Sequence, residues 1–298
     1  MRRGRAPRSG ARAGLRALLL VASLPAPGAA QSVLARVVTV EESEPIQGAL
    51  AYLVDDASDR VVRTSLTDEV GRALFAGVPA STYRLRAEMI GREQAESAPF
   101  AVADGAAVAR TLSLATRAIG LEGIEVTAET RRCTVRPGDD ALAVAHVWDE
   151  ARKALSAAAL TDESGVYRYE TVTYTRRLDA RTRAIFDQEE SRREAWAHRP
   201  FESRPAEDLV ERGFVQREGR DWVFYAPDAG VLLSDVFLDT HCFRLAEGEP
   251  GLIGLAFEPT RDRDDATDIQ GTLWLDAVNA ELRWLEFGYW NLPDFPPS

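Results

Sequence analysis

The chain has 298 residues, of which 45% are hydrophobic and 28% are charged, and its formal net charge at pH 7 is −11. This apolar share suits a folded globular protein of one or two domains and argues against a disordered chain. The acidic balance disfavours long-range attraction to nucleic acid or to anionic lipid, so we expect no nucleic-acid partner.

Residues 1–30 have the composition of a secretory signal peptide. Six arginines precede the apolar run at residues 18–24, and the small residues 28–30 offer a cleavage site before Gln31. Removing this segment would lower the net charge to about −17. No segment approaches the ~20 apolar residues of a transmembrane helix. The sequence therefore predicts an exported protein, in the periplasm, associated with the outer membrane, or extracellular.

Residues 31–116 read as short strands separated by turns. Gly48 permits a tight entry into a strand at 49–54. The tetrapeptide 68–71 reads as a turn, because Asp68 can bond backbone amides two residues on and Gly71 tolerates a positive φ. Further strands are expected at 34–40, around Leu74, at 83–87, 99–102 and 107–114. This spacing predicts an antiparallel β-sandwich.

The turn and strand residues of this segment resemble the carboxypeptidase regulatory-like domain. The residues that carry the resemblance are Pro45, Gly48, Ala49, Thr67, Asp68, Gly71, Phe75, Tyr83 and Leu85, within residues 33–115. The resemblance implies a transthyretin-like (prealbumin-like) Greek-key sandwich of about seven strands. It implies a non-enzymatic binding or assembly module, because peptidase chemistry belongs to a separate zinc domain.

Carbohydrate binding by the sandwich is an alternative function, since the fold is similar in class to starch-binding-like folds. Exposed coplanar aromatic rings would support it. The aromatic residues available are Tyr52, Phe75, Tyr83 and Phe100, and their positions favour the core.

Residues 117–136 form the predicted linker strand. The octapeptide 121–128 looks like the segment that joins such sandwiches to the plug of TonB-dependent outer-membrane receptors, although a plain linker explains it equally well. The resemblance implies an envelope protein or an outer-membrane receptor as partner.

Residues 137–298 predict an α+β domain, in which a long helix packs on a curved antiparallel sheet. Apolar residues recur at helical spacing over 140–160 (Leu142, Ala145, Trp148, Ala151, Leu155 and Ala159). Short helices are expected at 205–212 and 229–238. Strands are expected at 166–177, 184–197, 213–216, 222–226, 242–245, 252–258, 269–275 and 281–290.

The last hairpin, residues 269–290, is similar to the final hairpin of periplasmic lipoprotein-carrier-like half-barrels, which implies carriage of lipid or another hydrophobic ligand as a further alternative. Its candidate ligand-facing aromatics are Trp274, Trp284, Phe287, Tyr289 and Trp290, and core packing is the competing explanation. Strand parity places Trp284 and Trp290 on one face and Phe287 and Tyr289 on the other. We expect the long helix on one face and the two short helices over part of the opposite face.

Residues with catalytic or metal-binding potential are few. Cys133 and Cys242 are the only cysteines, which in an exported chain predicts a disulfide. None of the three histidines has zinc-peptidase spacing, and neighbouring residues on the strand around His241 point to opposite faces. The acidic run 261–268 lacks the glycine of a calcium loop and predicts a solvated hairpin loop. We therefore expect no enzyme, no metal and no cofactor.

Overall fold

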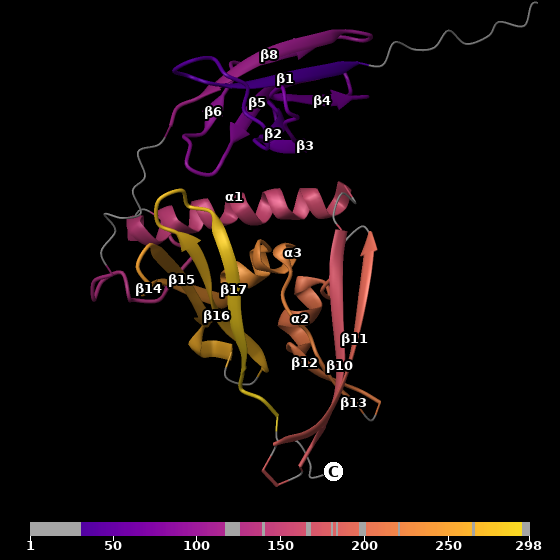
Figure 1. The fold of residues 1–298 in the computed structure, drawn as a ribbon. Coiled ribbons are helices and arrows are strands. Elements are labelled where there is room, and N and C mark those ends of the chain that lie inside the picture. Colours follow the sequence, from indigo (N-terminus) through magenta and orange to yellow (C-terminus); the bar gives the residue numbers. More distant parts are fainter. Residues whose placement is uncertain are drawn as a thin grey trace, which may run out of the picture.

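The computed structural model describes residues 31–116, 126–138, 141–164, 168–179, 181–182, 184–196, 201–219, 221–263 and 266–293. Figure 1 shows two units, an N-terminal sandwich and a second domain, whose long helix lies between the sandwich and the rest of the second domain. The predicted signal peptide and most of the octapeptide 121–128 lie outside the described residues.

The N-terminal unit is the predicted β-sandwich. One sheet has the order β4-β1-β8 and the other β3-β2-β5-β6, with β7 pairing with β5. The strands are β1 (Ser32–Thr39), β2 (Leu50–Asp55), β3 (Arg60–Leu66), β4 (Arg72–Ala76), β5 (Ser81–Glu88), β6 (Ala95–Glu96), β7 (Phe100–Val102) and β8 (Ala107–Leu114). β3 and the two-residue β6 are not among the strands that the sequence predicts. Leu74 is exposed, because Ala73 and Phe75 face the core instead.

Strand direction in the first sheet differs from the expectation. β1 pairs antiparallel with β4 but parallel with β8, from Ser32 opposite Ala107 to Thr39 opposite Leu114. A purely antiparallel sandwich is therefore wrong. Alternation of apolar residues specifies which side chains face the core, whereas it carries no signal for the direction of the neighbouring strand.

The turn between β3 and β4 has the predicted geometry. The Asp68 carboxylate accepts hydrogen bonds from the amides of Val70 and Arg72, and Gly71 has φ of +72°. A Cβ at Gly71 would lie 2.5 Å from the carbonyl oxygen of Val37. Glycine is therefore required at this position for both its backbone conformation and its size.

The second domain is the predicted α+β unit. Its helices are α1 (Leu142–Ser164), α2 (Ala206–Arg212), α3 (Ala229–Leu232) and α4 (Asp235–Thr240). Its main sheet has the order β17-β16-β15-β14-β9, with β9 (Thr134–Val135), β14 (His241–Glu247), β15 (Leu252–Pro259), β16 (Asp268–Asp276) and β17 (Leu282–Trp290). Two hairpins stand apart from it, β10 (Arg168–Leu178) with β11 (Ile185–Trp196), and β12 (Val215–Glu218) with β13 (Asp221–Phe224).

The four α-helices of the described part of this domain lie on one face of the main sheet, which we call the inner face. The core there combines Val147 of α1, Leu209 of α2, Leu232 of α3 and Phe237 of α4 with Leu255 and the other inward residues of the sheet. The expectation that the short helices cover the opposite face is wrong. They pack beside α1 because their buried residues join the same apolar core.

The apolar stripe of α1 is also shifted from the expected one. Val144, Val147, Ala151 and Leu155 are buried, whereas Leu142 at the start of the helix is exposed.

Candidate functional site

The opposite face of the main sheet, which we call the outer face, is left open by the helices. Its side chains come from alternate positions of β14 to β17. In register across the strands, one row contains Cys242 and Glu258, the next Arg244, Ala256, Thr272 and Glu286, and the next Ala246, Gly254, Trp274 and Trp284.

The five aromatic residues of the last hairpin divide between the two faces. Phe287 and Tyr289 are half-buried against the inner core. Trp284 is 47% exposed and Trp290 is 46% exposed, and both have the parity of the outer face. Trp274 lies opposite Trp284, with the ring centroids 6.3 Å apart. The hairpin therefore presents three tryptophans outward, and Phe287 and Tyr289 belong to the core.

Glycines on neighbouring positions make room for the Trp274 indole. A Cβ at Gly254 would lie 2.7 Å from Cζ3 of Trp274, and one at Gly248 would lie 2.6 Å from the same atom. On the other side of the ring, Nε1 lies 3.4 Å from Oε2 of Glu286 on β17. The ring thus lies over the sheet, held between glycines on one side and a carboxylate on the other.

A groove of about 480 Å³ lies on the outer face beside this tryptophan pair. Its lining is mostly polar, and it includes Arg244, Glu258, Gln270, Thr272, Glu286 and Gly288. A Cβ at Gly288 would meet no atom within 4 Å, so the groove floor is open above β17. This volume is within the range of small-ligand sites.

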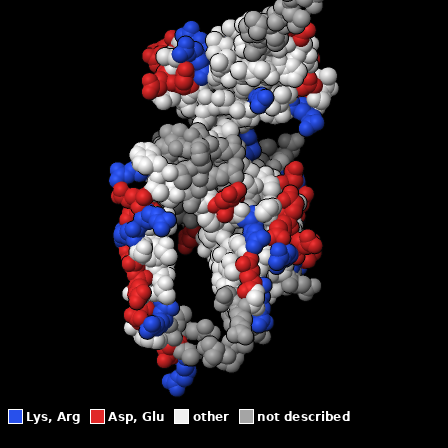
Figure 2. Space-filling view, turned by 90° about the vertical axis from the view of Figure 1, so that its right-hand side faces the viewer, with Lys and Arg blue, Asp and Glu red and all other residues white. Residues whose placement is uncertain are grey.

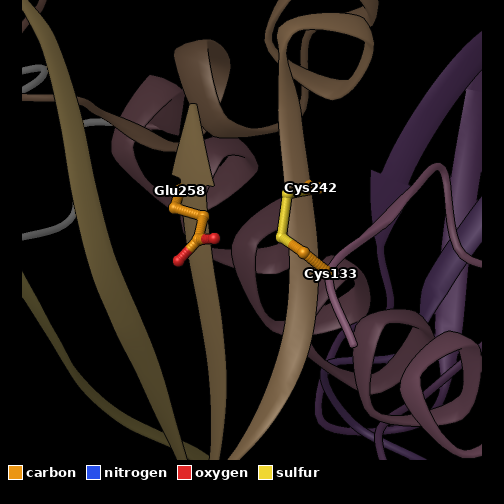
Figure 3. A group of neighbouring side chains, drawn as sticks. All are labelled: Cys133, Cys242 and Glu258. Carbon is orange, nitrogen blue, oxygen red and sulfur yellow. A yellow bond between two sulfur atoms is a disulfide. The ribbon is translucent and has the colours of Figure 1, made fainter. Parts of the chain in front are cut away.

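The predicted disulfide borders the same face. Cys133 and Cys242 are bonded, with their Cα atoms 5.1 Å apart. Cys133 directly precedes the edge strand β9, so the bond joins this edge of the sheet to β14. Figure 3 shows Glu258 on the adjacent strand β15, beside the two sulfurs. Cys133, Cys242 and Glu258 lie close enough for three metal ligands. Because both sulfurs are bonded to each other, this group is a covalent clamp rather than a metal site in the oxidised protein.

A second cluster of charged residues lies between the sandwich and α1. Lys153, the only lysine of the chain, is 2% exposed, and its Nζ lies 2.9 Å from Oε1 of Glu150 and 3.0 Å from Oδ2 of Asp149. Lys153 also donates to the carbonyl of Arg92, while Glu150 accepts from the amide of Gly91. These bonds tie α1 to the loop that follows β5.

A neighbouring part of this interface joins α1 to β5 and β2. Arg152 donates to Glu88, whose side chain is buried, and to Asp149. Burial, together with the Glu88 carboxylate, raises the pKa of Tyr52 to about 12. Burial alone would raise the pKa of Asp149, but hydrogen bonds from Arg152 and Lys153 outweigh it and hold this pKa below its usual value. Sequence spacing did not reveal this network.

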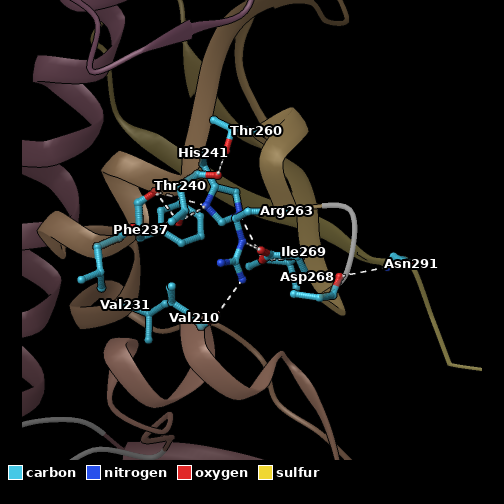
Figure 4. Close-up of polar contacts among 12 residues, drawn as sticks. Val210, Val231, Phe237, Thr240, His241, Thr260, Arg263, Asp268, Ile269 and Asn291 are labelled. Carbon is cyan, nitrogen blue, oxygen red and sulfur yellow. Dashed lines mark hydrogen bonds and ion pairs between the residues drawn. The ribbon is translucent and has the colours of Figure 1, made fainter.

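A third cluster is buried between α4 and β16 (Figure 4). His241 and Asp268 are both fully buried, with Nε2 of His241 3.1 Å from Oδ1 of Asp268. Arg263 pairs with the same carboxylate and donates to the carbonyl of Val210. Burial would raise the pKa of Asp268, but His241 and Arg263 together hold it below its usual value.

This cluster corrects one expectation from the sequence. The run 261–268 is not simply a solvated loop, because Arg263 and Asp268 pair inside the domain. His241 faces this cluster, while Cys242 points to the outer face and its disulfide. The two residues are therefore separated, as strand alternation indicates.

The charged side chains on one face of the molecule are mixed in sign. Figure 2 shows acidic and basic side chains interspersed over this view of the molecule, without a large area of one sign. Among the described residues, no helix is long and apolar enough to cross a membrane.

Comparison with known families identifies the first unit. Residues 32–115 match the carboxypeptidase regulatory-like domain, so the chain carries such a domain, as the turn residues indicate. No curated protein matches the sequence significantly.

Several solved structures are similar to a part of the chain. The minor pilin GBS52 of Streptococcus agalactiae is 16% identical, with a TM-score of 0.27, over 30% of this chain and 45% of the pilin. The TIE protein of Bacillus anthracis is 17% identical, with a TM-score of 0.26, over 29% of this chain and 17% of that protein. A 3-chlorocatechol 1,2-dioxygenase of Rhodococcus opacus 1CP is 13% identical, with a TM-score of 0.22, over 30% of this chain and 61% of the dioxygenase. The chain spans less than two thirds of each, and likenesses of this size say nothing of function.

Proposed function

We propose that this chain is a non-enzymatic exported protein that binds a component of the cell envelope or its surroundings through the second domain. The regulatory-like sandwich is the structural module that carries and orients this domain. The observation that carries the proposal is the open outer face of the main sheet, which has a polar groove beside exposed tryptophans.

The described clusters of charged residues support a structural rather than a catalytic use of titratable groups. Lys153 and Glu150 bind backbone groups across the interface, and Asp268 is paired with a buried histidine and an arginine. A general acid or base must reach a substrate proton, and side chains that are fully buried within the fold do not.

The two alternative binding modes have less support. Lipid carriage on the inner face would need free concave space, and that face is filled by the helices and their core. Carbohydrate binding by the sandwich would need exposed rings, whereas Phe75, Tyr83 and Phe100 are buried. Tyr52 is half-buried beside Glu88.

The proposal is tested with the full exported chain and insoluble envelope material from the organism that produces it. Labelled protein should sediment with this material saturably, and excess unlabelled protein should displace it. Serum albumin of similar acidity serves as the control for nonspecific retention. Retention that rises linearly with concentration and resists competition would contradict a binding function.

A further inference from the structure

We infer that the outer face of the β14–β17 sheet binds an uncharged, β-linked glycan chain, with Trp274 and Trp284 as the stacking surface and the adjacent groove as the site for hydroxyl groups. This inference rests on the proposed binding function and names the ligand class. The site is on the second domain, not on the sandwich.

The outer face of the main sheet exposes tryptophan side chains. A sheet covered on one face normally presents polar side chains on the other. Here Trp284 and Trp290 are each almost half exposed on the open face. A contiguous exposed apolar area bordered by polar residues marks an interaction site, and Trp284 is next to Trp274 on this face. Indole carries both a flat apolar surface and an N–H donor, which suits ligands that are themselves amphipathic.

Trp274 is held in one position by its neighbours. Gly248 and Gly254 leave space for its ring, and Glu286 lies within reach of its Nε1. A side chain held in one orientation loses little conformational entropy when a ligand stacks on it. Together with Trp284, 6.3 Å away and tilted by 38°, it forms a preformed aromatic surface at one end of the groove.

The chemistry of the groove selects among ligands. Glu258 and Glu286 offer acceptors, Arg244 offers donors, and Gln270 and Thr272 offer both. Sugar hydroxyls both donate and accept, so such a mixed set matches them. The apolar faces of equatorially linked pyranose rings stack on flat indoles. A lipid tail would leave these polar groups unpaired, at a cost in free energy. A polyanionic glycan would face two carboxylates and a chain of net charge −11.

The length of the face favours an extended chain over a single sugar. Trp284 and Trp290 are six residues apart on β17, or roughly 20 Å along the strand. Glu286 and Gly288 lie between them on the same face, and the absence of a side chain at Gly288 leaves space beside Trp290. The occupant therefore lies along β17, with Trp290 at the far end from the Trp274–Trp284 pair.

Affinity electrophoresis of the full exported chain tests the inference, with native gels containing laminarin, xylan, hydroxyethylcellulose or dextran. We expect retardation by at least one of the β-linked glycans. Trp284→Ala should weaken that binding at least about tenfold, because stacked tryptophans are typical binding hot spots. Trp196→Ala is the matched control, since Trp196 on β11 is 72% exposed and lies on a different hairpin.

A blocking variant keeps the test independent of stability. Gly288→Ile adds a β-branched side chain where a Cβ meets nothing within 4 Å, so the fold should tolerate it while the groove is filled. We expect lost retardation with an unchanged thermal midpoint. Retardation that persists in Gly288→Ile, or that Trp196→Ala abolishes equally, would place binding elsewhere and overturn the inference.

The remaining outcomes also decide the question. No retardation by any glycan of the panel overturns the glycan assignment, and saturable envelope sedimentation in the same preparation would show that the binding function itself survives. If Trp284→Ala instead changes the sedimentation coefficient of the free protein, the face is a contact between two copies of the chain, which also overturns the assignment.

Discussion

Nζ of Lys153 lies 2.9 Å from Oε1 of Glu150, and both side chains are almost completely buried where α1 meets the sandwich. Each partner also bonds a backbone group of the loop after β5, at Arg92 and Gly91. The contact therefore couples two ionised side chains to the docking of the two domains.

Lys153→Met should lower the free energy of unfolding by about 3–5 kcal/mol, because it leaves Glu150 buried without its charge partner. The double variant Lys153→Met, Glu150→Leu should cost less than this single change, since no unpaired charge is left. Urea unfolding followed by tryptophan emission measures both. Arg168→Met is the control, because the pair of Arg168 with Glu194 is exposed and should contribute less than about 1 kcal/mol. If Lys153→Met and Arg168→Met lower the free energy of unfolding equally, the stabilising role of the buried pair is refuted.

The sandwich, expressed as residues 31–116, should fold alone, with a β-type circular dichroism spectrum and a cooperative transition. Its core is contributed by its own strands. It should be less stable than in the whole chain, because Glu88 loses Arg152 and the loop at Gly91 loses Glu150. A disordered spectrum would show instead that the second domain is required for folding.

The disulfide should be found by peptide mapping without reduction, as a fragment pair joined through Cys133 and Cys242. Closing a loop of 109 residues is nominally worth about 4–5 kcal/mol in the chain-entropy model. The double variant Cys133→Ser, Cys242→Ser should therefore unfold at a lower urea concentration, with the sandwich transition unaffected. Free thiols at both positions in the exported protein would contradict the bond.

Asp268 should make stability sensitive to acid. Its pKa in the folded protein lies below the usual value of 3.8, so its contribution is present above about pH 4 and is lost as pH falls through the lower folded pKa. Asp268→Asn should lower stability by about 2–4 kcal/mol at pH 7. The difference between this variant and the parent should shrink below pH 4 in thermal melts. Glu189→Gln, on an exposed strand, is the control and should change stability equally little at every pH. If the stability difference between Asp268→Asn and the parent does not change with pH, the lowered pKa of Asp268 is refuted.

Local signals made the sandwich predictable. The Asp68–Gly71 turn requires particular side-chain and backbone chemistry, so it is visible in the sequence. Parity alone separated Trp284 and Trp290 from Phe287 and Tyr289. The packing of α2, α3 and α4 determines which of these faces is covered. This packing is tertiary structure, and the apolar periodicity of a helix does not predict which face of a sheet the helix covers.

The sequence did not predict the two buried ion pairs, Glu150 with Lys153 and His241 with Asp268, and the reason differs for each. Glu150 and Lys153 are three residues apart on α1, which is a spacing that usually denotes a solvated helix face. Their position beside the buried Val147 and Ala151 was the available signal, because it implies a helix covered on two sides. His241 and Asp268 come from strands that are not adjacent in the sheet, and no local pattern joins them.

The parallel pairing of β1 with β8 has a consequence for how the protein is attached to anything upstream. Ser32 and Ala107 share one end of the sandwich, while Leu114 lies at the other end, close to Arg92 and so to Lys153 of α1. The eight residues of β1 span about 26 Å. A tether, label or fusion partner joined before Gln31 is therefore about a strand's length away from the contact of Arg92 with Lys153.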